Sequence, residues 1–313
     1  MLTRRAFALS ATGLMATAAL PAFARAPLGS VLPSFHRVKV GDIEITALLD
    51  GQLMLSPDYF MGLPAADLTA ILDAVGQDNT LETPVNTFVI NTPGGTYLID
   101  TGLGTSQVFG PGQGNTARNL AAAGITPDQI DAVILTHAHP DHAEGLLDGD
   151  GKALFANAEI VVHEAEVAFW NDDAMLAAAP DAAKGMFASA RKTLSPYANR
   201  TRLVQGGEVF PGITLHHSPG HTPGHSVLHV ASGDAQFMIM GDTINNVAIH
   251  TAAPQVGFGF DTDATLAAAS RRKLMDMAAA DGIMTASTHV NFPGFGRYKA
   301  NGDHFVYLPA DWS

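Results

Sequence analysis

The feature that most constrains this 313-residue chain is a run of six residues, His137 to His142, that holds three imidazoles and one carboxylate. It reads His-Ala-His-Pro-Asp-His and follows the apolar stretch Val133–Leu135, which predicts a buried strand. Clustered imidazoles repel one another when protonated and are costly to bury. A divalent cation that accepts their lone pairs removes both problems. The run therefore predicts a metal site in the loop after a strand.

Other apolar runs also end near a residue that can bind a metal. Including the first, the runs are Val133–Leu135, Ile213–Leu215, Phe237–Met240 and Ile283–Met284, and the residues that follow them are His137, His221, Asp242 and His289. In folds built of sheets and helices, sites form beyond strand ends because loops there project side chains from a rigid frame. We therefore expect these four side chains to meet.

Composition limits the chemistry. The chain has no cysteine, so disulfides, thiolate nucleophiles and thiolate metal sites are excluded, and any metal must be held by nitrogen and oxygen. The formal net charge is −13, with 30 acidic against 17 basic residues, which argues against a nucleic-acid partner. The 47% apolar content suffices for a buried core. With no interdomain linker visible, we expect residues 25–313 to form one domain.

Residues 1–24 read as a signal peptide. Arg4 and Arg5 precede a weakly apolar stretch, and Ala22-Phe23-Ala24 forms a small-residue cleavage site. The paired arginines resemble a twin-arginine signal, which predicts a periplasmic or secreted protein. The stretch from Ala6 to Leu20 is too short and too diluted by Ser, Thr and Gly for a stable membrane anchor.

Local patterns predict hairpins first and alternating strands and helices later. Hairpins are expected over Arg37–Leu49 and Thr87–Ile99, each around a glycine-containing turn. A short helix should begin at the cap Asn115 and stop at Gly124. A longer helix is expected over Asp263–Ala280, with a buried face formed by Leu266, Leu274 and Met277.

The ordered motifs resemble those of the metallo-β-lactamase superfamily. The His-x-His-x-Asp-His run looks like its signature, and three later segments are similar to its following motifs: Pro219–Ser226, Gly241–Thr243 and His289–Gly294. The resemblance implies an αββα sandwich, an α/β fold with two mixed β-sheets flanked by helices. It also implies that His137, His139 and His221 hold one metal, that Asp141, His142 and His289 hold the other, and that Asp242 bridges them.

Such a site predicts a hydrolase. Nitrogen and oxygen ligands suit two Zn²⁺ ions, with Mn²⁺, Co²⁺ and Fe²⁺ as alternatives. Two cations about 3.5 to 4 Å apart can share a hydroxide, lowering the pKa of its parent water toward ~7, and that hydroxide is the nucleophile. We expect Asp141 and Asp242 to act catalytically beside it.

The remaining polar candidates are Asp100 and the other histidines. The family places an aspartate like Asp100 near the metals, where it could orient a ligand imidazole, but an aspartate that forms the turn before Gly102 explains it equally well. His225 is interpreted as structural or as a support for the ligands. The other histidines are interpreted as structural: His36, His163, His216, His217, His229, His250 and His304.

Over nearly all of the mature chain the resemblance is strongest to the methyl parathion hydrolase branch and its relatives, lactonases and arylesterases. That branch binds the leaving group in an aromatic pocket, and Phe109 and Trp170 match it by position, while Met186 replaces a further aromatic residue. The match predicts small, neutral, hydrophobic substrates such as lactones, aryl esters or phosphotriesters. Met186 argues against strong organophosphate hydrolysis. The alternative for Phe109 and Trp170 is core packing.

Other functions stay open at this point. A periplasmic β-lactamase of a subclass without a metal-binding cysteine fits the fold and the signal, and a glyoxalase-like thioesterase shares the motifs. Di-iron oxygen-reducing relatives usually carry Glu at the position of His139. A periplasmic metal-binding protein without enzyme activity is the non-catalytic alternative. The sequence leaves the oligomeric state open, with a homodimer as one alternative.

Overall fold

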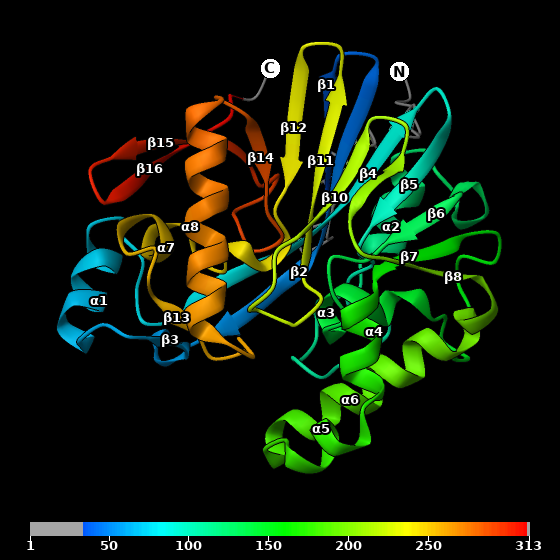
Figure 1. Ribbon diagram of the computed structural model, residues 1–313, viewed down its shortest axis with the longest axis horizontal. Helices are drawn as coiled ribbons and strands as arrows, with labels where there is room; N and C mark the ends of the chain where they lie inside the picture. The colour runs from blue at the N-terminus through cyan, green and yellow to red at the C-terminus, as the bar shows by residue number, and fades with distance from the viewer. Residues whose placement is uncertain (1–33, 312–313) are drawn as a thin grey trace, which may run out of the picture. The chain divides into compact units, whose positions relative to one another are not determined.

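The computed structural model describes residues 34–311, and two seven-stranded sheets packed face to face form its centre (Figure 1). The first sheet has the order β1-β2-β4-β5-β6-β7-β8 and the second β16-β15-β14-β12-β11-β10-β9. Both sheets are mixed, because β5 to β8 run parallel in the first and β12 pairs parallel with β14 in the second. The predicted signal peptide lies outside the described residues.

The strands of the first sheet are β1 (Phe35–Val40), β2 (Ile43–Leu55), β4 (Leu81–Thr92), β5 (Gly95–Ile99), β6 (Ala132–Ile134), β7 (Glu159–His163) and β8 (Thr201–Val204). Those of the second are β9 (Gly207–Phe210), β10 (Ile213–His217), β11 (Ser226–Ser232), β12 (Ala235–Ile239), β14 (Met284–Ala286), β15 (Phe295–Asn301) and β16 (His304–Pro309). A small third sheet pairs β3 (Phe60–Met61) with β13 (Gly257–Phe258). Both predicted hairpins are confirmed as β1–β2 and β4–β5.

Helices cover the two outer faces. On the first sheet lie α2 (Thr116–Ala122), α4 (Glu164–Asn171) and α6 (Asp181–Leu194), whose Leu120 and Phe187 share a buried cluster with Val133. On the second lies α8 (Ala264–Ala280), whose Leu274 packs in a cluster with Met238. Alternate strand residues fill the space between the sheets, since successive side chains point to opposite faces. The predicted αββα sandwich is confirmed.

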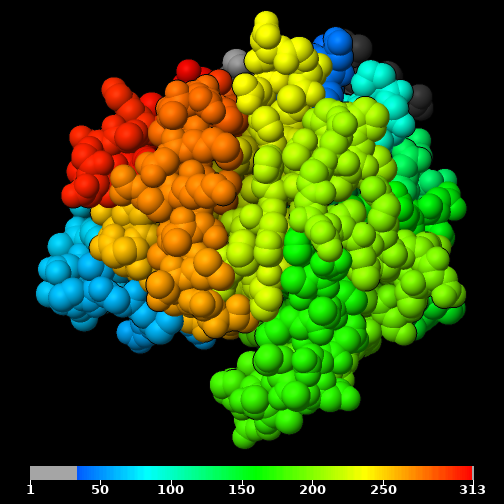
Figure 2. All heavy atoms as spheres, in the orientation of Figure 1, coloured from blue at the N-terminus to red at the C-terminus, as the bar shows by residue number. Residues whose placement is uncertain are grey.

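The remaining helices are short and lie at the ends of the sheets or in the loops. They are α1 (Ala65–Asp73), α3 (Pro140–Ala143), α5 (Asp173–Ala178), α7 (Val247–Ala252) and the 3-10 turns η1 (Pro57–Tyr59), η2 (Pro127–Gln129), η3 (Glu144–Leu146), η4 (Ser195–Arg200) and η5 (Gly241–Thr243). In Figure 2 the atoms of α5 and the start of α6, in green, extend beyond the neighbouring surface. Within the described residues, no helix combines the length and apolarity needed to cross a membrane.

Both predicted helices are confirmed as α2 and α8, but a side-chain detail of each differs from the prediction. The Asn115 side chain does not cap α2 but donates to the Asp50 carbonyl oxygen at 2.7 Å, and the Asp50 carboxylate instead accepts from the Thr116 N–H at 3.0 Å. In α8, Leu266 is exposed, and the buried face carries Arg271. The Arg271 guanidinium is satisfied by backbone carbonyls, including that of Thr243 at 2.7 Å, so a charged side chain occupies a core position.

Candidate metal centre

Three imidazoles converge where β6 ends. Pro140 starts α3 and leaves His139 at its N-cap, so His137 and His139 lie on the extended segment between strand and helix. His221 comes from the loop between β10 and β11 of the other sheet. The His139 Nδ1 atom lies 3.0 Å from Nε2 of His137 and 3.0 Å from Nε2 of His221. We call His137, His139 and His221 the triple-histidine group.

A second set combines a carboxylate with two imidazoles. Asp141 and His142 lie on α3, and His289 follows β14 of the second sheet. The Asp141 Oδ2 atom lies 3.7 Å from His142 Nε2 and 3.5 Å from His289 Nε2. We call Asp141, His142 and His289 the mixed group.

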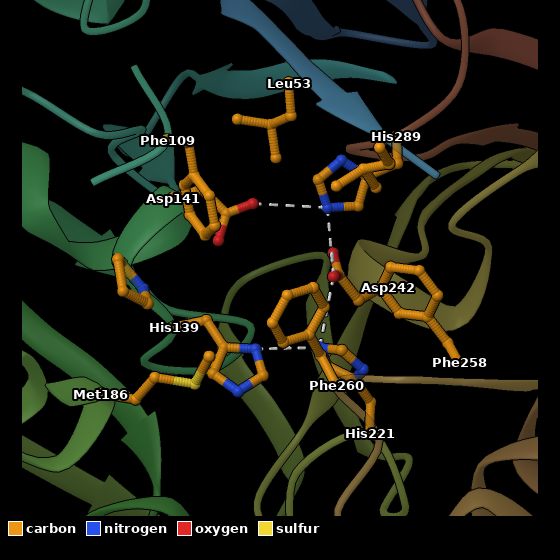
Figure 3. A pocket seen from close by; sticks show the side chains of 12 residues that line it. Leu53, Phe109, His139, Asp141, Met186, His221, Asp242, Phe258, Phe260 and His289 are labelled. Carbon is orange, nitrogen blue, oxygen red and sulfur yellow. Dashed lines mark hydrogen bonds and ion pairs between the residues drawn. The ribbon is translucent and has the colours of Figure 1, made fainter. Parts of the chain in front are cut away.

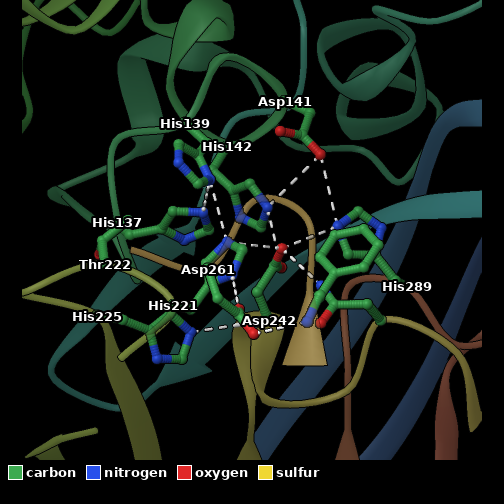
Figure 4. Close-up of polar contacts among 12 residues, drawn as sticks. His137, His139, Asp141, His142, His221, Thr222, His225, Asp242, Asp261 and His289 are labelled. Carbon is green, nitrogen blue, oxygen red and sulfur yellow. Dashed lines mark hydrogen bonds and ion pairs between the residues drawn. The ribbon is translucent and has the colours of Figure 1, made fainter. Parts of the chain in front are cut away.

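Asp242, in η5 directly after β12, lies between the two groups (Figure 4). Its Oδ2 atom is 3.2 Å from His221 Nε2 and 3.1 Å from His289 Nε2, and its Oδ1 atom is 3.0 Å from His142 Nε2. Within the described part of the chain, every cluster of side chains able to hold a metal draws on the seven ligands that the sequence suggests. Those seven side chains therefore form two adjoining sets that share one carboxylate.

Two buried atoms at this point lack hydrogen-bond partners. They are His142 Nε2 and Asp242 Oδ1, which face each other without hydrogen-bond geometry. Leaving such atoms unpaired in a protein interior is costly, and a divalent cation would bind both. Because the donors are imidazole nitrogens and carboxylate oxygens, the residues present fit two zinc-type ions.

Burial and neighbouring charges set the protonation of the groups. Burial and the adjacent imidazoles lower the pKa of His137 and of His139 well below the usual range, so these rings are neutral with free lone pairs. Burial alone would also lower the pKa of His221, but Asp242 and Asp261 raise it to about 9. Within the mixed group, the carboxylates outweigh burial and raise the pKa of both imidazoles. The neutral imidazoles of His137 and His139 therefore lie next to imidazoles that are paired with carboxylates.

Three ligand imidazoles are oriented through the ring nitrogen that points away from the centre. The Nδ1 atom of His142 lies 2.8 Å from Asp100 Oδ2, and Nδ1 of His221 lies 2.9 Å from Asp261 Oδ1. His289 Nδ1 lies 2.8 Å from the Pro84 carbonyl oxygen. Such contacts fix ring orientation and tautomer in metal sites.

Asp100 both forms a turn and contacts a ligand imidazole. Its φ of +58° is the only positive value at a non-glycine residue of the described chain, so it forms a left-handed turn. Its carboxylate also accepts from the Thr136 N–H at 2.8 Å and the Thr136 hydroxyl at 2.7 Å, besides contacting His142. The turn therefore aims the carboxylate at the loop that carries the ligands.

The other histidines lie outside the two groups. His225 Nε2 accepts from the Asp242 N–H at 3.1 Å, so it supports the backbone of the shared carboxylate. His163 caps α4 by accepting from the Ala165 N–H at 3.1 Å, and His250 accepts from the Asn245 N–H at 3.1 Å. None of these three belongs to a metal-competent cluster of residues 34–311.

A pocket opens above the centre (Figure 3). Phe109 and Met186 line it, at the positions where the sequence suggests a pocket wall. Phe260 stands near His139, with ring centroids 6.4 Å apart, and Leu53 is drawn on the side of Asp141 and His289. The full lining comprises Leu53, Leu55, Phe109, His139, Pro140, Asp141, Met186, His221, Asp242, Phe258, Phe260 and His289.

Trp170 is absent from the lining of this pocket but lines an adjoining one, which shares His139, Met186 and Phe260 with it, so its place in a substrate pocket stays a prediction. The side chain is 2% exposed and packs against Phe187, with ring centroids 4.8 Å apart, while one edge approaches His139. Its Nε1–H donates to Glu166, one turn earlier on α4, at 2.6 Å. This partner satisfies the indole N–H of a largely buried side chain.

Sequence reasoning missed several residues of the site. Leu53 and Leu55 alternate on β2 and could have been found from that period, since they point to one face. Phe258 ends β13 and Phe260 follows it, in a segment whose sequence shows no periodicity. Asp261 is a single polar residue after an aromatic one, a pattern that predicts no contact with a metal ligand. Their positions depend on how this segment returns to the pocket.

Two packed mixed sheets with metal-competent side chains at the strand ends define a metal-dependent hydrolase of the αββα type. The family model described as "Metallo-beta-lactamase superfamily" matches residues 80–282, and the chain belongs to this superfamily. This confirms the class of enzyme predicted from the motifs.

The relatives narrow the comparison to lactonases. An N-acyl homoserine lactonase of Bacillus thuringiensis is 26% identical over 239 residues, which cover 69% of this chain and 86% of that protein. The corresponding enzyme of Bacillus cereus is 26% identical over 237 residues, with the same shares covered.

Two solved structures share the whole architecture. A hydrolase named AbOPH, in the beta lactamase superfamily, has a TM-score of 0.85 at 29% identity, covering 91% of this chain and 100% of that one. AidC, a dizinc quorum-quenching lactonase solved with a product, has a TM-score of 0.82 at 27% identity, covering 89% and 98%.

Proposed function

We propose that this protein hydrolyses lactones with two zinc ions, and that aryl esters are secondary substrates. The observation that carries the proposal is the pair of adjoining ligand groups that share Asp242. The similarity to N-acyl homoserine lactonases and to a dizinc lactonase supports the reaction class. Two divalent ions supply a Lewis acid for the carbonyl oxygen and a water of lowered pKa.

The chain's own residues hold and orient the reactants. His137 and His139 offer neutral nitrogens, and the mixed group with Asp242 offers carboxylate oxygens that balance positive charge. Asp141 is the most exposed of the seven ligands and lines the pocket. Its carboxylate is therefore placed to take the proton of the attacking water and return it to the leaving oxygen of the opened ring.

The pocket wall supports a neutral substrate. The side chains around the ligands are apolar, from Leu53 and Phe109 to Met186 and Phe260, and no lysine or arginine of the described residues lines the pocket. An anionic thioester of the glyoxalase kind would find no cation there, whereas an uncharged ring would be desolvated at little cost. This favours lactones over the thioesterase alternative.

A substrate panel with metal analysis tests the proposal. We expect about two zinc ions per chain and the highest kcat/KM on lactones, lower values on aryl esters, and the lowest on β-lactams, thioesters and phosphotriesters. Exhaustive chelation should abolish the activity, and zinc should restore it. Full activity without metal, or a preference for β-lactams, would contradict the proposal.

We also propose export by the twin-arginine route. It rests on the sequence of residues 1–24 alone. Replacing Arg4 and Arg5 with Lys should retain the precursor in the cytoplasm, because that route reads the arginine pair and not its charge. Unchanged delivery of the doubly substituted protein would indicate a general secretory route instead.

A further inference from the structure

Glu166 on α4 is a fully buried carboxylate to which the proposed reaction assigns no role. Its Oε1 atom accepts from the Ala138 N–H at 2.9 Å and from the Trp170 Nε1–H at 2.6 Å. Its Oε2 atom accepts from the Thr222 hydroxyl at 2.6 Å and from the Gly224 N–H at 3.1 Å. Four donors therefore converge on one carboxylate that solvent does not reach.

The partners of Glu166 are placed beside the metal ligands. Ala138 lies between His137 and His139, after β6 of the first sheet, and Thr222 directly follows His221, before β11 of the second sheet. One side chain thus joins the two loops that supply the triple-histidine group. We propose that Glu166 is a positioning residue that holds these loops at the spacing a metal ion requires, an inference that rests on the proposed metal site.

The chemistry of the contacts calls for a carboxylate. The Ala138 and Gly224 N–H groups and the indole N–H can only donate, so the group between them must accept on both oxygens. Burial raises the pKa of Glu166, and the four hydrogen bonds offset only part of the cost of burying its charge. A glutamine of equal size would turn an amide N–H₂ toward the Gly224 N–H, which would then lose its acceptor.

The backbone contact at Gly224 makes this junction intolerant of displacement. A Cβ atom at position 224 would lie 2.2 Å from the Glu166 nitrogen, so the loop and the start of α4 are in direct contact. Only glycine permits this approach. The loop that carries His221 therefore cannot move away from α4 without losing both the carboxylate contacts and its packing.

The mixed group does not depend on Glu166. Its imidazoles are oriented by Asp100 and by the Pro84 carbonyl oxygen, and none of the four hydrogen bonds of Glu166 reaches α3. Replacing Glu166 should therefore weaken one metal position and leave the other unchanged. A purely structural role would lower stability and weaken both.

Zinc titration of the metal-free mature protein, read with a chromophoric chelator, distinguishes these outcomes. For Glu166→Gln we expect one of the two zinc dissociation constants to rise about 10- to 100-fold while the other stays as in the wild type. Ring ¹⁵N NMR of histidine-labelled protein at limiting zinc should show His142 and His289 bound, with the triple-histidine group free. Unchanged constants, or equal increases in both together with a lower Tm, would overturn the inference.

Matched variants keep the test decisive. Glu164→Gln, an exposed residue on the same helix, should titrate like the wild type. If Glu166→Gln does not fold, Thr222→Val carries the test, because it removes one of the four hydrogen bonds; it should weaken the same constant by a smaller factor, and Thr222→Ser should restore it. A Thr222→Val protein with wild-type constants would overturn the inference. Wild-type protein that binds no zinc would instead refute the proposed function.

Discussion

The two halves of the metal centre are built differently. In the triple-histidine group the loops that carry the ligands are held through their backbone and only His221 faces carboxylates, whereas both imidazoles of the mixed group face carboxylates directly. The pKa of His137 and His139 is lowered by burial, while carboxylates raise the pKa of His142 and His289. His221 is the exception in the first half, because Asp242 and Asp261 raise its pKa. The first half is therefore arranged for a metal mainly by its scaffold, and the second by its charges.

Replacing the shared carboxylate, Asp242, should have the largest effect on activity and metal content, because it contacts both halves of the metal centre. Asp242→Ala removes the oxygen atoms that contact His221, His142 and His289, and leaves buried charge unpaired in both halves. We expect kcat/KM on a lactone to fall more than about 100-fold and the metal content to drop well below that of the wild type. Elemental analysis and kinetics on one preparation measure both, with exposed Asp234→Ala as the control. Near-normal metal content would contradict the bridging position.

Replacing a residue that orients the ligands should weaken zinc binding in one half of the metal centre only. Asp100→Asn keeps a residue that tolerates the positive φ but exchanges the acceptor at His142 for an amide. We expect it to weaken zinc binding about 10- to 100-fold at the mixed group only, the reverse of the effect of Glu166→Gln. Histidine ring NMR at limiting zinc reports which rings are bound. If both variants weaken the same position, the halves are not independently supported.

Different side chains of the pocket wall lie beside each half of the metal centre. Phe260 lies near His139 of the triple-histidine group, and Leu53 is drawn on the side of the mixed group (Figure 3). Phe260→Ala should lower kcat/KM for hydrophobic lactones by about 5- to 30-fold, or roughly 1 to 2 kcal/mol of lost contact, at unchanged metal content. Exposed Val108→Ala serves as the control. Loss of metal in Phe260→Ala would show that the residue supports a ligand instead of a substrate.

The smallest expected effect lies at the start of α4, the helix that carries Glu166. Burial and the stacked His217, 3.9 Å away between ring centroids, lower the pKa of His163 in the folded protein. Because the unfolded chain then binds the proton first, stability should decline as pH falls below about 6.5. His163→Asn keeps a helix cap without the titration. Between pH 7 and 5 its Tm should fall about 1 to 2 °C less than that of the wild type, and identical pH profiles would contradict the assignment.

Much of the centre could be predicted because it is encoded locally. His137, His139, Asp141 and His142 share one short segment, and the other ligands directly follow strands whose apolar runs are visible in the sequence. The sandwich followed from the same runs, since strands with buried faces need a partner sheet.

The supporting residues could not be predicted, because their partners are distant in sequence. Glu166 reads as an ordinary acidic residue in the first turn of a helix, and its role appears only when residues 138 and 224 lie beside it. The hydrogen bond from Trp170 to Glu166 is equally invisible in the sequence, because a Trp four residues after a Glu on a helix has no fixed partner. Arg271 likewise reads as a surface cation, although backbone carbonyls satisfy it in the interior.

The central claim is that two adjoining ligand groups share Asp242 and hold two metal ions. Anomalous diffraction at the zinc absorption edge from crystals of the mature protein grown with zinc tests it most directly. We expect two peaks, one among His137, His139 and His221 and one among Asp141, His142 and His289, with the Asp242 carboxylate between them. A single peak, or peaks away from these side chains, would contradict it.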